Sequence, residues 1–128
     1  MTTHQLPADG SPVVFGIGHM LLRTRDLDRS LAFYTDVLGL TIRKRGKARD
    51  GGPLVATNEG IALTTGRVDG ESPIEHLALH GARIEALAER ARQHGVEIVD
   101  GPAVTDEYGT SIYVEDPDGN RIEIYGDA

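Results

Sequence analysis

The sequence contains two related segments, and this internal repeat is the feature that most constrains the fold. Residues 17–22 (IGHMLL) resemble residues 74–79 (IEHLAL) at an offset of 57 positions. Residues 61–63 (IAL) resemble residues 122–124 (IEI) at an offset of 61. Because 128 residues are enough for one domain of ordinary size, the repeat predicts two similar halves that share one core.

Each half is predicted to contain one helix. The first is expected over residues 27–38, with Asp26 as the N-cap and Gly39 just after the last turn. Its apolar side chains recur on one helical face, at Leu27, Leu31, Tyr34 and Leu38. The second helix is expected over residues 83–94 and stops at Gly95.

Short alternating segments around these helices predict strands, so each half reads β-α-β-β-β. The strands that follow the helices are expected at residues 40–45, 53–57, 61–65, 96–100, 110–115 and 121–125. We therefore predict an α+β fold, in which two tandem β-α-β-β-β modules form a half-open barrel around a cleft. Residues 1–12 are predicted to be a flexible tail and residues 13–126 a single domain, with module one at 13–68 and module two at 73–126.

Composition excludes several classes of function. The chain has no cysteine, so disulfides and thiolate metal sites are impossible and a metal site would use His, Asp or Glu. The net charge of −7 disfavours nucleic acid as a partner. No apolar run is long enough to span a membrane, and residues 1–12 lack a signal-peptide pattern, so we expect no membrane association and a cytoplasmic location.

Strand alternation places several chemically versatile side chains on one sheet face. His19, His76 and Glu123 are predicted to share the face that the helices do not cover. Two imidazoles and one carboxylate form an open site for a divalent transition metal, although each residue could instead be an ordinary polar side chain on a half-exposed strand. Tyr113 and His80 share this face and are the candidates for moving protons.

The motifs around these residues resemble those of the vicinal oxygen chelate superfamily, over residues 14–126. This superfamily includes glyoxalase I, bleomycin-resistance proteins, fosfomycin-resistance transferases and extradiol dioxygenases. The resemblance is carried by residues 18–22, 26–34, 36–40, 74–77 and 113–123.

The resemblance implies a single divalent metal ion (Fe, Mn, Co, Ni or Zn), held by residues on the first and last strands of each module. In this chain those positions are His19, Ala62, His76 and Glu123. Because Ala62 cannot bind a metal, the pattern departs from that of glyoxalase I. The three remaining ligands look more like those of extradiol dioxygenases or fosfomycin-resistance enzymes.

Neither of these subclasses fits completely. Tyr113 matches a tyrosine of the extradiol pattern, but residues 104–106 lack its acid–base histidine. Ser111 and Tyr113 match the fosfomycin enzymes, whereas Leu21 and Ala103 stand where those enzymes have threonine and lysine. The choice between lyase or isomerase chemistry and dioxygenation therefore stays open.

Two functions follow. The first is a divalent-metal-dependent enzyme that acts on a small oxygen-rich molecule. The alternative is a metal-free protein that binds a drug or metabolite, as bleomycin-resistance proteins do. The resemblance also implies a homodimer, in which His19 of one chain could meet His76 and Glu123 of another, and the sequence leaves open whether the site is shared in this way.

Overall fold

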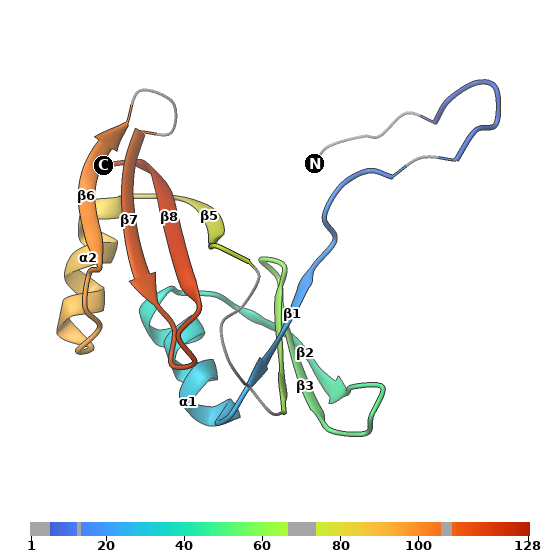
Figure 1. The fold of residues 1–128 in the computed structure, drawn as a ribbon, viewed down its shortest axis with the longest axis horizontal. Helices are drawn as coiled ribbons and strands as arrows, with labels where there is room; N and C mark the ends of the chain where they lie inside the picture. Colours follow the sequence, from blue (N-terminus) through green and yellow to red (C-terminus); the bar gives the residue numbers. More distant parts are fainter. Residues whose placement is uncertain (1–5, 13, 67–73, 106–108) are drawn as a thin grey trace.

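A computed structural model describes residues 6–12, 14–66, 74–105 and 109–128, which form two four-stranded sheets with their helices (Figure 1). The first sheet and its helices comprise β1 (Met20–Thr24), α1 (Leu27–Ala32), η1 (Phe33–Val37), β2 (Ile42–Lys47), β3 (Pro53–Thr57) and β4 (Ile61–Thr65). The second comprises β5 (Leu77–Ala82), α2 (Ile84–Gln93), β6 (Asp100–Thr105), β7 (Gly109–Glu115) and β8 (Arg121–Asp127).

The two sheets have the same topology. Their strand orders are β1-β4-β3-β2 and β5-β8-β7-β6, and in each the first strand runs parallel to the last. Leu21 pairs with Ala62 in the first sheet, as Ala78 pairs with Glu123 in the second. Both sheets are open, and the predicted α+β fold of two β-α-β-β-β modules is confirmed. The module boundaries stay a prediction, because residues 67–73 lie outside the described part of the chain.

The helices begin and end close to the predicted residues. Asp26 caps α1 by accepting a hydrogen bond from the amide of Arg29 at 3.1 Å. The predicted single helix changes register after Ala32 into the wider η1, where the amide of Leu38 donates to the carbonyl of Phe33. Gly39 follows with a φ of 78°, a left-handed conformation that glycine adopts without strain.

The sixth strand was predicted wrongly. It was expected over residues 96–100, but β6 begins at Asp100 and runs through Pro102 to Thr105. The register shifts between Asp100 and Ala103, and β6 is an edge strand. An edge tolerates proline because the missing N–H bond would face outward, so β6 can continue through Pro102.

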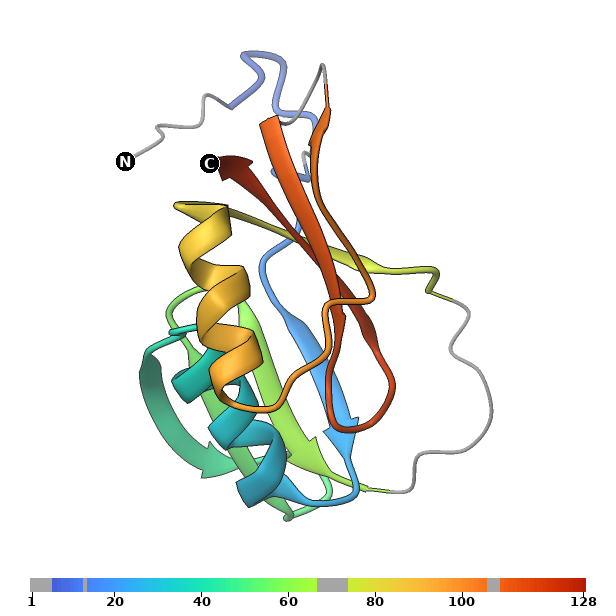
Figure 2. The ribbon, with the colours of Figure 1, turned by 90° about the vertical axis from the view of Figure 1, so that its left-hand side faces the viewer.

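Both helices lie on the same side of the molecule, α1 against β4 and α2 against β7 and β8 (Figure 2). The side chains between helices and strands form the core, with Tyr34, Ile84, Ala88, Ile112 and Ile122 fully inaccessible. Among the described residues, no helix covers the opposite face of either sheet. Residues 14–18 precede β1 in an extended segment that projects away from the sheets (Figure 1). No helix among the described residues is long and apolar enough to cross a membrane.

The β7–β8 turn fastens the second sheet to the first helical segment. The Tyr34 hydroxyl donates to Asp116 Oδ2 at 2.6 Å, and Asp118 accepts from the Ser30 hydroxyl and the Arg25 amide, both at 3.1 Å. Burial acts to raise the pKa of Asp118, but hydrogen bonds from Thr24, Arg25 and Ser30 together with the Arg25 charge hold this pKa below its ordinary value. These contacts join residues more than 80 positions apart and fix the turn against α1 and η1.

Candidate metal centre

Glu123 is a carboxylate held on the uncovered face of the second sheet. It lies between Ile122 and Ile124, whose side chains enter the core on the other face. Its neighbours across the ladders are Ala78 on β5 and Tyr113 on β7. Glu123 is 8% exposed, which is unusual for a carboxylate and indicates that its charge is satisfied by specific partners.

His76 immediately precedes β5, and its imidazole faces Glu123. The distance from His76 Nε2 to Glu123 Oε1 is 3.4 Å. Two ligand atoms bound about 2.1 Å from one ion at a right angle lie about 3 Å apart. The pair is therefore spaced as two ligands of a single divalent cation would be.

The other polar atoms of these two residues are already engaged. His76 Nδ1 lies 2.7 Å from Glu75 Oε2, and the Ser111 hydroxyl donates to Glu123 Oε2 at 2.7 Å. Partners of this kind orient metal ligands in proteins, because they fix the imidazole tautomer and the carboxylate plane. The hydrogen bond with His76 is the main reason that the pKa of the Glu75 carboxyl lies below its ordinary value.

Tyr113 forms a wall of the same site. Its ring meets the ring of His76 edge-to-face with centroids 5.6 Å apart, and Arg121 Cζ lies 4.6 Å from its centroid on the ring face. Partial burial raises the pKa of the Tyr113 phenol, and the charge of Glu123 and a hydrogen bond with it act in the same direction, against the charge of Arg121. Tyr113 is therefore protonated at neutral pH and can donate a hydrogen bond or a proton.

His80, the other predicted proton carrier, lies farther along β5. Its ring packs against the Tyr125 ring with centroids 5.3 Å apart, and it is exposed. It lies four positions after His76, which corresponds to roughly 13 Å along an extended chain. His80 shares the predicted face but is not beside the His76–Glu123 pair.

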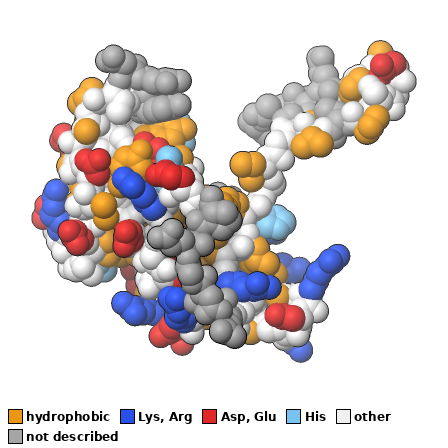
Figure 3. Space-filling model, in the orientation of Figure 1, with side chains coloured by type: hydrophobic (Ala, Val, Ile, Leu, Met, Phe, Trp, Pro, Cys, Tyr) orange, Lys and Arg blue, Asp and Glu red, His pale blue; other side chains and the backbone are white. Residues whose placement is uncertain are grey.

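His19 is exposed and immediately precedes β1, so it occupies in the first sheet the place that His76 occupies in the second. Among the residues that the structure describes, no three His, Asp or Glu side chains form a group that could hold a metal. Figure 3 shows histidine atoms beside acidic and basic side chains over the second sheet and, well apart from these, near the start of β1. Within one chain, the fold thus brings together two of the three predicted ligands.

Three residues that contact the side chains of this site were not predicted from the sequence. They are Glu75, Ser111 and Arg121, and Arg121 Nη1 lies 3.8 Å from Glu75 Oε1. Strand alternation contains the signal for two of them, because Arg121 and Ser111 each lie two residues before a site residue of their strand. Glu75 is the immediate neighbour of His76 in the sequence, so alternation would place it on the opposite face and gives no signal for its contact with His76.

The chain matches the model of the Glyoxalase/Bleomycin resistance protein/Dioxygenase superfamily over residues 16–124, and it belongs to this family. It is 32% identical to a probable lactoylglutathione lyase of Synechocystis over 120 residues, which cover 83% of this chain and 91% of the relative. Its fold is similar to glyoxalase I of Leishmania major, with a TM-score of 0.71, 28% identity, and coverage of 89% of this chain and 88% of that one. It is also similar to the fosfomycin resistance protein FosX of Listeria monocytogenes complexed with Mn(II), with a TM-score of 0.72, 20% identity, and coverage of 91% and 95%.

Divalent metal ions are common in this family. The relatives therefore support the metal-dependent function of the glyoxalase or dioxygenase type that the sequence predicts.

Proposed function

We propose that the protein is a divalent-metal-dependent enzyme of the glyoxalase or dioxygenase type, with His76 and Glu123 as two of its metal ligands. The observation that supports this proposal is the close approach of the His76 imidazole to the Glu123 carboxylate. Its two facing atoms, His76 Nε2 and Glu123 Oε1, are 3.4 Å apart, while the remaining atoms of both side chains are held by Glu75 and Ser111.

His19 of a second copy of the chain supplies the third ligand. His19 is exposed just before β1, and the first strand of each sheet is an edge strand with one side that no other described strand pairs. A homodimer in which the first sheet of one chain meets the second sheet of its partner places this imidazole opposite the pair. Such a site consists of two histidines and one carboxylate, with open positions for a substrate.

When bound, the metal supplies a Lewis acid that stabilises negative charge on adjacent substrate oxygens. Tyr113 directs its phenol into the same space and donates a hydrogen bond or a proton to a substrate oxygen. Arg121 keeps the Tyr113 ring in place through its contact with the ring face. His80, packed against Tyr125, contacts a substrate that extends along β5 and exchanges protons with the part of that substrate farthest from the metal.

The test is metal content. Purified without chelator, the chain is expected to carry about one divalent ion, and Glu123→Gln and His76→Ala are expected to lose it. Glu97→Gln is the matched control, because Glu97 is an exposed glutamate outside the β5–β8 sheet. Full metal content in Glu123→Gln, with the far-ultraviolet circular dichroism spectrum unchanged, would refute the assignment.

The alternative is a metal-free binding protein, which is favoured by the absence of a three-ligand group among the described residues of a single chain. In that case the wild type is purified without stoichiometric metal. Added Mn(II) or Ni(II) then leaves its melting temperature unchanged.

A further inference from the structure

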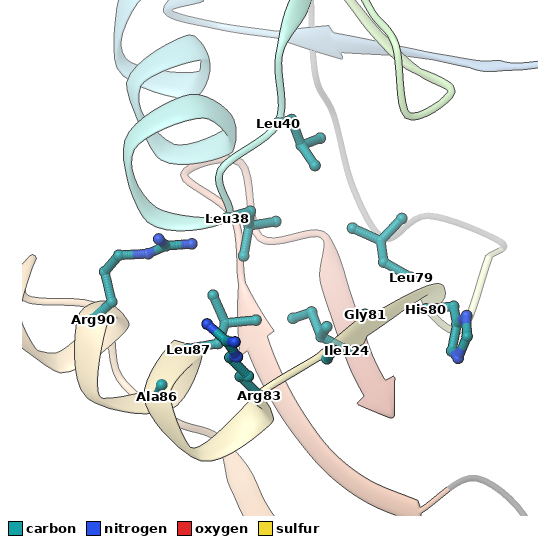
Figure 4. Close-up of a pocket in the computed structure, with 11 residues that line it drawn as sticks. Leu38, Leu40, Leu79, His80, Gly81, Arg83, Ala86, Leu87, Arg90 and Ile124 are labelled. Atoms are coloured by element: carbon teal, nitrogen blue, oxygen red, sulfur yellow. The ribbon is translucent and has the colours of Figure 1, made fainter. Parts of the chain in front are cut away.

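A cavity lies on the helix side of the second sheet, away from Glu123. It has a volume of about 420 Å³ and lies, open to solvent on one side, between the segment after η1, β5 and α2. Figure 4 shows its apolar side chains directed into this space, namely those of Leu38, Leu40, Leu79, Leu87 and Ile124. The volume lies within the range of small-molecule sites, and the wall is the apolar surface that such sites present.

Two arginines from α2 complete the lining. Arg83 is the N-cap residue, and Arg90 belongs to the last turn. Arg90 Nε donates to the carbonyl of Val37 at 2.8 Å, which anchors the side chain and leaves its terminal nitrogens for another acceptor. In the described part of the chain neither guanidinium pairs with a carboxylate, although the protein as a whole carries a net charge of −7.

The backbone of Arg83 is strained. Its φ of 55° and ψ of 51° are left-handed, and it is the sole non-glycine residue with positive φ among those described. Its side chain makes no capping bond to α2. Glycine would adopt this conformation without strain. The presence of arginine at this strained position therefore indicates a role for its side chain, such as binding a ligand.

We propose that this cavity binds a small apolar monocarboxylate. The hydrocarbon part lies among the leucines and Ile124, and the carboxylate lies between the guanidinium groups of Arg83 and Arg90. Planar guanidinium groups recognise carboxylates through paired hydrogen bonds, and each buried methylene adds to affinity. This site lies on the opposite face of the sheet from His76 and Glu123, so it does not depend on the metal centre.

The probes are butanoate, hexanoate, octanoate and 1-octanol, titrated into the purified chain by calorimetry. Affinity is expected to rise about fourfold per methylene along the carboxylate series. Octanoate is expected to bind about tenfold more tightly than 1-octanol, because only the acid engages the arginines. The proposal would be overturned by equal affinity for octanoate and 1-octanol, or by no binding of octanoate at millimolar concentration. It would also be overturned if a second copy of the chain covered the cavity and excluded octanoate.

Arg83→Gly separates binding from folding. It removes the guanidinium and relieves the backbone strain, so the melting temperature is expected to stay equal or to rise while octanoate affinity falls about tenfold. Affinity for 1-octanol is expected to stay unchanged. Arg92→Ala is the matched control, because Arg92 lies on the same helix outside the cavity and pairs with Glu89. Octanoate binding to Arg83→Gly as tight as to the wild type contradicts the assignment of the carboxylate.

A filled cavity gives the converse test. Ala86 lines the cavity from an exposed position on α2, so Ala86→Phe is expected to fill it without displacing buried core residues. Both octanoate and 1-octanol are expected to lose at least tenfold in affinity. Undiminished binding of both probes would show that they bind elsewhere and would overturn the proposal.

Discussion

Removing one hydroxyl group tests how firmly the β7–β8 turn holds the two halves together. Tyr34 is completely inaccessible, and its hydroxyl donates to Asp116 Oδ2 at 2.6 Å. Burial, followed by the charge and hydrogen bond of Asp116, raises the pKa of this phenol, so Tyr34 stays protonated at neutral pH and donates this hydrogen bond. Tyr34→Phe keeps the ring packed against Phe33 and removes only this bond.

The expected loss is about 2 kcal/mol of unfolding free energy, because a buried hydrogen bond to a charged group contributes about 1.5–3 kcal/mol. Asp116 Oδ2 retains the Asn120 amide at 2.8 Å, which keeps the loss from the upper end of that range. Urea unfolding at pH 7 measures the change, and a double-mutant cycle with Asp116→Ala isolates the pairwise coupling. A loss below about 0.5 kcal/mol, or no coupling in the cycle, would show that the bond is not a structural link between the halves.

Three further outcomes are expected. The pKa of the Asp118 carboxyl is depressed in the folded state, so the stabilisation from its charge is present above its ordinary pKa near 3.8 and is lost as pH falls through the folded value. Asp118→Asn should therefore lower the free energy of unfolding at pH 7 by about 1–2 kcal/mol, as measured by urea unfolding. This difference from the wild type should close below about pH 4. Glu75→Gln should weaken metal binding about tenfold in competition with a chelator, because it removes the charged partner of His76 Nδ1, and unchanged affinity would exclude this orienting role. Tyr113→Phe should keep the metal content while the turnover of any identified substrate falls about 100-fold, and a fall in metal content instead would make Tyr113 a structural support of the site.

The internal repeat and the strand period were sufficient to predict most of the fold. The offset between His19 and His76 predicted two equivalent strands, and the ladder registers confirm that Ala62 and Glu123 occupy equivalent positions. The two ends of the first helical segment, at Asp26 and Gly39, were also predicted correctly, because capping signals depend on only a few neighbouring residues.

The features that escaped prediction depend on interactions across the fold. The sixth strand starts later than predicted and contains Pro102, which a place at the sheet edge tolerates. Alternation predicted correctly that His76, Glu123 and Tyr113 share a face, but it carries no information about distance between chains or halves. Periodicity could not predict the distance between His76 and Glu123 or the separation of His19 from both. These distances depend on how the strands and the two sheets are placed relative to one another.

Mixing two inactive variants tests most directly the proposal that two chains complete each metal centre. His19→Ala and Glu123→Gln are each expected to bind no stoichiometric metal alone. When they are mixed in equal amounts and allowed to exchange subunits, half of the dimers are mixed and each carries one intact site, so metal binding should return to about a quarter of the wild-type value. No recovery, in a mixture in which native mass spectrometry shows mixed dimers, would contradict a shared site.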